Sequence, residues 1–244
     1  AGLASEAQDD AEIRGVVLDP SGRPLPDAEV VLRTTQGTCR HNAYEFVNGR
    51  DVTDDHGRFV LPAPPAAMEV YVRHAAYAPA WAEAGNDAVV RMEPACWLEG
   101  SINTPARLQV SRGPWRFVDE TIEGDYRCGP LPAGLVLSLN VESTTHRPFH
   151  DRLVLQKAET RHVDVTLAPG ASVTGTVVPA HANATIHAHG PDGDVFVATT
   201  TDDGTFTVTG LEDGWVRLVV LSPGRSAQVI DTETGEDVEV RWSR

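Results

Sequence analysis

Apolar and polar residues alternate in three short segments of the chain, residues 28–33, 106–111 and 184–189. The first, third and fifth positions of each segment are apolar, and the positions between them are mostly polar. Successive side chains of a β-strand point to opposite faces, so this period of two predicts a strand with one buried face. An amphipathic helix would repeat its apolar positions at intervals of three and four, and we find no window with such a stripe.

A second pattern, a glycine followed two residues later by an aromatic residue, also occurs three times. It lies at residues 57–59, 124–126 and 204–206, each time after one of the alternating segments. We expect the glycine to occupy a turn, where it tolerates a positive φ, and the aromatic residue to begin an inward-facing row. Because the two patterns recur in the same order, the sequence predicts three copies of one structural unit.

The copies follow one another closely, without a glycine- and serine-rich stretch of the kind that makes a linker flexible. The last predicted strands of the first two copies, at residues 90–94 and 165–169, end in proline. Proline cannot donate a hydrogen bond to a sheet and so lies at strand ends or edges. We therefore predict three domains stacked end to end, at residues 12–95, 96–170 and 171–244. Residues 1–11 are small and polar, and we expect them to be disordered or to act as a tether.

The number and spacing of the predicted strands indicate the fold class. Many short strands separated by turn signals are typical of a β-sandwich made of two sheets. Each copy spans roughly 80 residues, which is within the usual range for a small independent domain. The predicted fold is all-β, with three tandem Ig-like or transthyretin-like sandwiches in an elongated arrangement.

The composition is strongly acidic, with a formal net charge of −15 at pH 7. Such a charge repels nucleic acid and anionic lipid, and binding to either needs clustered lysine and arginine. The sequence also has no apolar run that approaches the roughly 20 residues needed to cross a bilayer. We therefore expect no nucleic-acid partner and no membrane insertion.

The three cysteines, Cys39, Cys96 and Cys128, are an odd number and cannot all form intramolecular pairs. Cys128 takes the inward position that Leu61 and Val208 occupy in the other copies, which favours a small buried hydrophobic side chain there. A bridge between any two of the three is compatible with the sequence. We take Cys96–Cys128 as the expected disulfide.

The first copy carries residues of a known family pattern at 15–19, 22–30 and 53–59 and at Tyr77. With them the chain resembles the carboxypeptidase regulatory-like domain, whose fold is a transthyretin-like seven-stranded sandwich. Shorter parts of the pattern recur in the second and third copies. The resemblance implies a non-catalytic β-module of bacterial proteins that are secreted, periplasmic or on the cell surface, although one fold can host many roles.

Candidate chemistry is sparse in this sequence. His187 and His189 lie two apart on one predicted strand, so both point to one face and could chelate Zn²⁺ or Cu²⁺. The repeat aligns them with Val31 and Arg33 on the outer face, which favours a solvent-facing pair and no metal. Aspartates within residues 51–55 and at Asp202 and Asp203 could bind Ca²⁺, but acids at tight turns commonly bond their own backbone.

We find no Ser/His/Asp arrangement and no glycine-rich phosphate loop in the sequence. We therefore expect no cofactor and no enzymatic activity. A metal-dependent enzyme with a transthyretin-like fold, built on the histidine pair, is the remote alternative.

Tyr44, Trp81 and Trp115 lie outside the aromatic positions that the copies share. Exposed aromatic side chains stack on sugar rings or anchor protein partners, whereas a bland role for each would be to cap its own domain. The leading hypothesis is an extracellular or cell-envelope structural module, either a semi-rigid spacer or a partner-binding accessory region. Its partner would be a protein or further copies of the chain. A carbohydrate- or protein-binding module that uses these three aromatics is the alternative.

Overall fold

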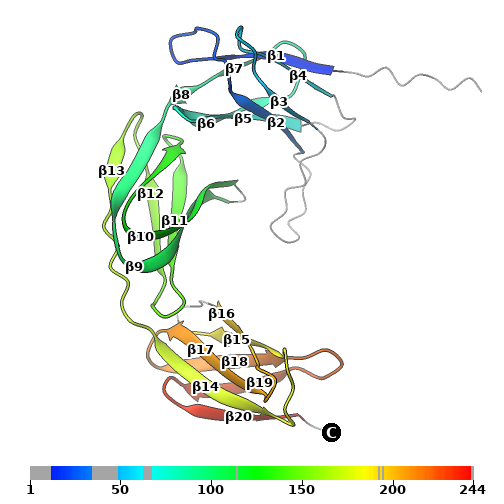
Figure 1. The fold of residues 1–244 in the computed structure, drawn as a ribbon, viewed down its shortest axis with the longest axis vertical. Helices are drawn as coiled ribbons and strands as arrows, with labels where there is room; N and C mark the ends of the chain where they lie inside the picture. Colours follow the sequence, from blue (N-terminus) through cyan, green and yellow to red (C-terminus); the bar gives the residue numbers. More distant parts are fainter. Residues whose placement is uncertain are drawn as a thin grey trace, which may run out of the picture.

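The structure is a computed structural model that describes residues 12–34, 49–62, 68–113, 115–191, 193 and 195–242. All regular secondary structure in these residues is β-strand, so the all-β prediction is confirmed. Figure 1 shows three groups of strands that follow one another along an arc. We call them the first region (residues 12–95), the second region (96–170) and the third region (171–242). The tether expected at residues 1–11 lies outside the described residues.

The first region is a sandwich of two sheets, with strand orders β4-β1-β7 and β3-β2-β5-β6-β8. Strand β1 pairs antiparallel with β4 and parallel with β7. Side chains of both sheets, such as Val17 and Val30, meet in one hydrophobic core. The strands are β1 (Glu12–Leu18), β2 (Glu29–Thr34), β3 (Arg50–Val52), β4 (Arg58–Pro62), β5 (Met68–His74), β6 (Tyr77–Glu83), β7 (Ala88–Arg91) and β8 (Glu93–Pro94).

The second region is built around two strands of 17 residues each, which run together as a long antiparallel hairpin. Strand β9 pairs parallel with β13 near its start and antiparallel with β11 near its end. Strand β11 in turn pairs antiparallel with β12. The region has its own hydrophobic core. The strands are β9 (Cys96–Arg112), β10 (Trp115–Leu131), β11 (Val136–Glu142), β12 (Phe149–Val154) and β13 (Thr160–His162).

The third region repeats the sheet orders of the first, as β17-β14-β20 and β16-β15-β18-β19. Strand β14 pairs antiparallel with β17 and parallel with β20, as β1 does with β4 and β7. A third hydrophobic core lies between the two sheets. The strands are β14 (Ala171–Val178), β15 (Thr185–His189), β16 (Val195–Thr199), β17 (Thr205–Leu211), β18 (Trp215–Leu221), β19 (Gln228–Glu233) and β20 (Asp237–Arg241).

An early glycine lies directly opposite the aromatic residue of the Gly-x-aromatic pattern in every region. The pairs are Gly15–Phe59, Gly100–Tyr126 and Gly175–Phe206. A Cβ atom on Gly15 or Gly175 would meet the Cζ atom of the opposite ring at 2.4 or 2.5 Å, which no real side chain tolerates. The glycine therefore provides the space into which the inward-facing ring packs.

The glycine of the second copy does not lie in the turn that the sequence predicted. Gly57 and Gly204 precede β4 and β17 with φ of 69° and 82°, as expected for turn residues. Gly124, with φ of 80°, instead lies inside β10 at a register shift. A bulge of this kind places an extra residue in one strand and bends it. The turn prediction is wrong here because β9 and β10 stay paired on both sides of Gly124.

Candidate interaction surface between the first and second regions

The outer part of the β9–β10 hairpin carries two aromatic side chains on one face. Trp115 and Phe117 lie at the start of β10 on either side of Arg116, where the β9–β10 ladder shifts register between Arg116 and Val118. Both aromatic rings contact Trp81, whereas Arg116 bonds Asp119. Trp115 and Phe117 are half-buried, whereas Arg116 is exposed. The sequence alternates here as in a core strand, but these residues lie beyond the part of β9 that pairs with β13.

The first region presents an apolar row on the outer face of its larger sheet. Val31, Tyr71 and Trp81 lie directly opposite one another across β2, β5 and β6. Their neighbours along each strand point inward to the core, so these three side chains point away from it. Val31 and Tyr71 are nevertheless only 2% and 3% exposed. Something must cover this face.

The hairpin aromatics and the outer row of the first region form one aromatic cluster, which we define as Tyr71, Trp81, Trp115 and Phe117. The ring centroid of Trp115 lies 5.2 Å from that of Tyr71 and 5.3 Å from that of Trp81, in a nearly perpendicular arrangement with the latter. The rings of Trp81 and Phe117 are 6.0 Å apart. Tilted and edge-on ring pairs at such distances contribute about 0.5–1.5 kcal/mol each beyond the area they bury.

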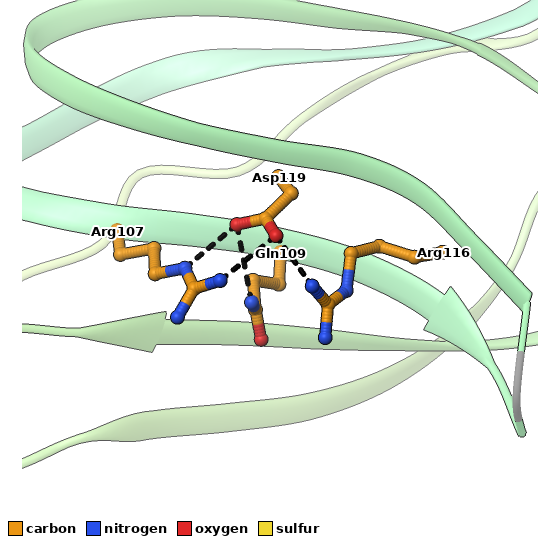
Figure 2. A network of polar contacts seen from close by, with 4 residues as sticks. All are labelled: Arg107, Gln109, Arg116 and Asp119. Atoms are coloured by element: carbon orange, nitrogen blue, oxygen red, sulfur yellow. Dashed lines mark hydrogen bonds and ion pairs between the residues drawn. The ribbon is translucent and has the colours of Figure 1, made fainter. Parts of the chain in front are cut away.

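A polar network braces the opposite face of the same hairpin (Figure 2). Asp119 accepts hydrogen bonds from Arg107 Nε at 2.7 Å, Arg107 Nη2 at 2.8 Å, Gln109 Nε2 at 3.1 Å and Arg116 Nη1 at 2.6 Å. These donors, with Arg107 first, hold the pKa of Asp119 well below its ordinary value despite some loss of hydration. Because Arg107 and Gln109 belong to β9 and Asp119 to β10, the network ties β9 to β10, the strand that carries both Trp115 and Phe117.

Further contacts join the first two regions beside the aromatic cluster. Strand β8, which directly precedes β9, pairs with β6. Lys157 forms an ion pair with Glu93 across the junction. Between the regions lies an open groove of about 650 Å³, lined mostly by apolar side chains from both, including Trp81 and Leu155. The Nε1 atom of Trp81 is buried and has no hydrogen-bond partner among the described residues.

The second and third regions meet through a junction of different chemistry. Arg147, in the loop between β11 and β12, bonds Glu212 at 3.1 Å and Asp213 at 3.4 Å in the loop after β17. The hydroxyl of Thr209 donates to the carbonyl of Thr144. The amide of Gly170 donates to the carbonyl of Thr145 in the same loop. This junction is built from charges and backbone hydrogen bonds.

The structure places the three predicted aromatic contacts in different situations. Trp81 and Trp115 lie together in the aromatic cluster, where each also contacts Tyr71. They are therefore not the separate exposed platforms that sugar binding would use, nor does each simply cap its own region. Tyr44 lies outside the described residues. The role of Tyr71 was missed, although an aromatic residue at an outward position between Val70 and Val72 is a signal of a covered face.

His187 and His189 lie on the outer face of β15, alternating with the buried Ile186 and Ala188. Arg217 lies directly opposite His189 on the neighbouring strand. The positive charge of its guanidinium group disfavours binding of a metal cation beside it. Among the residues described by the structure, no three histidine, cysteine, aspartate or glutamate side chains gather as metal ligands would. The metal site considered for this pair is not assembled.

The turn aspartates are occupied by their own loops. Asp54 accepts hydrogen bonds from the amides of His56 and Arg58, both at 2.8 Å. Asp203 accepts hydrogen bonds from Thr201 and Thr205. These bonds hold the pKa of both aspartates below the ordinary value. The oxygens considered for Ca²⁺ therefore stabilise tight turns.

The disulfide expected between Cys96 and Cys128 is wrong for this structure, where both thiols are free and buried. In the β9–β10 ladder Cys128 lies opposite Leu98, and Cys96 lies opposite Leu131, so the two side chains are offset along the strands. The thiol of Cys96 instead donates to the carbonyl of Gln156 at 3.0 Å. Burial raises the pKa of Cys128 to about 12, in agreement with a hydrophobic role. Cys39 lies outside the described residues.

No helix among the described residues is long and apolar enough to cross a membrane. A comparison with curated proteins gives no match. Solved structures with a detectable likeness include the TIE protein of Bacillus anthracis, at 15% identity and a TM-score of 0.27, covering 94% of this chain and 49% of that one.

Two pilins also show a likeness. A streptococcal ancillary pilin is 12% identical with a TM-score of 0.31, covering 96% of this chain and 99% of that one. The minor pilin of Streptococcus agalactiae is 10% identical with a TM-score of 0.32, covering 64% of this chain and 96% of that one. At sequence level, residues 12–93 match the family model of the carboxypeptidase regulatory-like domain, which confirms the resemblance of the first region.

Proposed function

We propose that this chain is a non-catalytic structural module of the cell surface or envelope. In this proposal three tandem sandwiches, at residues 12–95, 96–170 and 171–244, form a semi-rigid spacer. The spacer sets the distance and direction between whatever is attached at its two ends, and it binds protein partners or further copies of itself. Its mechanism is mechanical and involves no turnover.

The recurrence of one strand arrangement supports the three-copy proposal. In each region the strand with the early glycine pairs antiparallel with the aromatic strand and parallel with a later strand, which is β7, β13 or β20. Buried threonines repeat as well. Thr53 accepts from the amide of Ala28 at 2.9 Å, and Thr200 accepts from the amide of Ala184 at 2.9 Å. The second copy departs most, because its first two strands merge into β9.

The single observation that carries the spacer proposal is the aromatic cluster. When a neighbouring region buries an apolar sheet face, the two regions cannot separate without exposing apolar surface to water. This exposure costs roughly 25 cal/mol for each Å². The hairpin that supplies Trp115 and Phe117 is itself braced by Asp119. The first junction therefore resists bending. The match of residues 12–93 to a family of accessory β-domains supports a role without catalysis.

Small-angle X-ray scattering of the full chain tests this proposal. A single globule of 244 residues would have a radius of gyration of about 18 Å. The spacer predicts a value well above this and a pair-distance distribution with the long tail of an extended particle. A radius near that of one globule would contradict the proposal.

The same measurement on a Trp115→Ser/Phe117→Ser variant tests the role of the aromatic cluster. We expect a broader distribution of particle dimensions, because the first junction loses its apolar contact. Val60→Ser/Val89→Ser, at valines that are 46% and 59% exposed in the first region, is the matched control and should leave the scattering curve unchanged. If both variants scatter like the unaltered chain, the cluster does not hold the junction.

A further inference from the structure

The larger sheet of the third region carries a row of three valines and one histidine across its outer face. Val197, His187, Val219 and Val229 lie directly opposite one another across β16, β15, β18 and β19. We call these four residues the valine row. Val197 and Val229, at the two ends, are 61% and 60% exposed. No described residue from another part of the chain packs over them.

Apolar side chains on the same face extend the valine row in both directions along the strands. Val195, Leu221 and Trp215 are 50%, 40% and 45% exposed. Beside the row, Arg217 Nε bonds Asp231 Oδ1 at 2.8 Å, so this ion pair adds no net charge. The chain as a whole carries a net charge of −15. This face also carries His187, and Glu233 lies opposite Trp215, so it is rich in apolar side chains and has a low net charge for so acidic a protein.

The equivalent row of the first region shows what such a face does in this fold. Arg50, Val31, Tyr71 and Trp81 occupy the same four strand positions there. That row is covered by the hairpin of the second region through Trp115. The sheet position is the same in both regions, but only the first has an occupant among the described residues.

The outer face of the second region shows the opposite solution. Its central row across β9, β11 and β12 is Gln109, Asn140 and His150, and the row beside it is Ser111, Ser138 and Arg152. His150 Nδ1 and Asn140 Oδ1 are 3.0 Å apart. This face is open and polar. The outer face of the first region's larger sheet is thus apolar and covered, and that of the second region is polar and open, whereas the valine row of the third region is exposed.

We propose that the valine row is the contact surface for a second copy of this chain, with the two sheets packed face to face about a two-fold axis. Sheets pack in this way through branched aliphatic side chains, about 10 Å apart. A two-fold contact must be complementary to itself, and a surface with one cation beside one anion meets this demand. Arg217 of one copy then lies near Asp231 of the other.

Electrostatics favour this face over the rest of the surface. Two copies with a charge of −15 repel each other, so they associate best where the contact area is neutral. The contact also leaves the aromatic cluster and the first junction untouched. The proposal rests on the binding to further copies in the proposed function and names the surface that makes it. The spacer role can fail or hold separately, because a chain that stays monomeric can still be a semi-rigid spacer.

Sedimentation velocity of the full chain over two decades of concentration tests the proposal. We expect a reversible monomer–dimer equilibrium. In a Val197→Lys/Val229→Lys variant the dimer dissociation constant should rise by about tenfold or more, because charged side chains replace the apolar contact. Val60→Lys/Val89→Lys is the control. These valines are 46% and 59% exposed on the first region, and the change adds the same charge, so the dimer should persist.

Three outcomes would overturn the proposal. The unaltered chain could remain monomeric over the whole range. The dimer could survive Val197→Lys/Val229→Lys, as pairing through free strand edges would predict. The control could weaken the dimer equally, which would make the effect one of general charge. Circular dichroism of both variants, expected to match the unaltered chain, distinguishes loss of contact from loss of fold.

Discussion

The two junctions of this chain connect the three β-regions by different physical means. The first buries aromatic rings from β5, β6 and β10 against one another and leaves Tyr71 3% exposed. The second relies on Arg147, which reaches Glu212 and Asp213, and on hydrogen bonds of a single loop. Apolar burial is insensitive to salt, whereas exposed ion pairs are screened within about 10 Å at 0.1 M salt.

The chemistry of the two junctions determines where the spacer would bend. An aromatic contact has a steep cost for separation, because water must enter between rings that were packed. Ion pairs at the surface contribute little, typically 0–1 kcal/mol, and several geometries serve them equally well. We therefore expect a stiff first junction and a more compliant second junction within one chain.

The largest effect should follow removal of the hairpin aromatic at the first junction. Trp115→Ala is expected to lower the free energy of unfolding by about 2 kcal/mol, less than for a fully buried tryptophan because Trp115 is half-buried. Urea titration followed by circular dichroism measures this. Trp215→Ala should cost about 0.5 kcal/mol or less, since that ring is 45% exposed and rests on Arg217. Equal losses in the two variants would show that the cluster contributes nothing special.

A smaller effect is expected at the second junction. Arg147→Ala should lower the free energy of unfolding by about 1 kcal/mol, because it removes the ion pair with Glu212. The Arg147 side chain is one-third exposed, and its Nε has no hydrogen-bond partner among the described residues. The fluctuations between the second and third regions should increase, and high salt should have a similar effect on the unaltered chain. Arg152→Ala, at an exposed arginine of β12, is the control and should change neither. If high salt increased the fluctuations at the first junction as much as those at the second, the proposed difference between the two junctions would be wrong.

The smallest effect concerns the brace of the hairpin. Hydrogen bonds from Arg107 depress the pKa of Asp119 in the folded state, so its contribution is complete above the ordinary pKa of aspartate and disappears as the pH falls through the lower folded value. Asp119→Asn should reduce stability at neutral pH by about 0.5 kcal/mol. Its stability should also fall less than that of the unaltered chain between about pH 4 and pH 2. Parallel pH profiles for the two proteins would exclude this role.

The sequence predicted the strands better than it predicted the contacts between them. Alternation in residues 28–33, 106–111 and 184–189 fixes which side chains face each core, because the period of two acts locally. The long hairpin was not predicted, since residues on both sides of Gly124 alternate as any strand does. The contact between Trp115 and Tyr71 joins residues 44 positions apart, and nothing local specifies it.

The misjudged cysteine pair has the same origin. The sequence indicated an inward position for Cys128 but no strand for Cys96, and a disulfide also depends on register. In the β9–β10 ladder, which contains register shifts, Cys128 lies opposite Leu98 and Cys96 opposite Leu131. Bulges of this kind arise from packing across the whole region. The sequence drew attention to Trp81 and Trp115 as aromatics outside the shared positions, but it could not show that their rings contact each other.

The most direct test of the account is the distribution of distances across each junction, measured by pulsed electron paramagnetic resonance. Labels at Val89→Cys and Arg152→Cys span the first junction, and labels at Arg152→Cys and Thr207→Cys, an exposed position of β17, span the second. Cys39 is replaced by serine. The account predicts one narrow distribution across the first junction, a broader one across the second, and broadening of the first alone by Trp115→Ala. A first distribution as broad as the second, or one unchanged by Trp115→Ala, would contradict it.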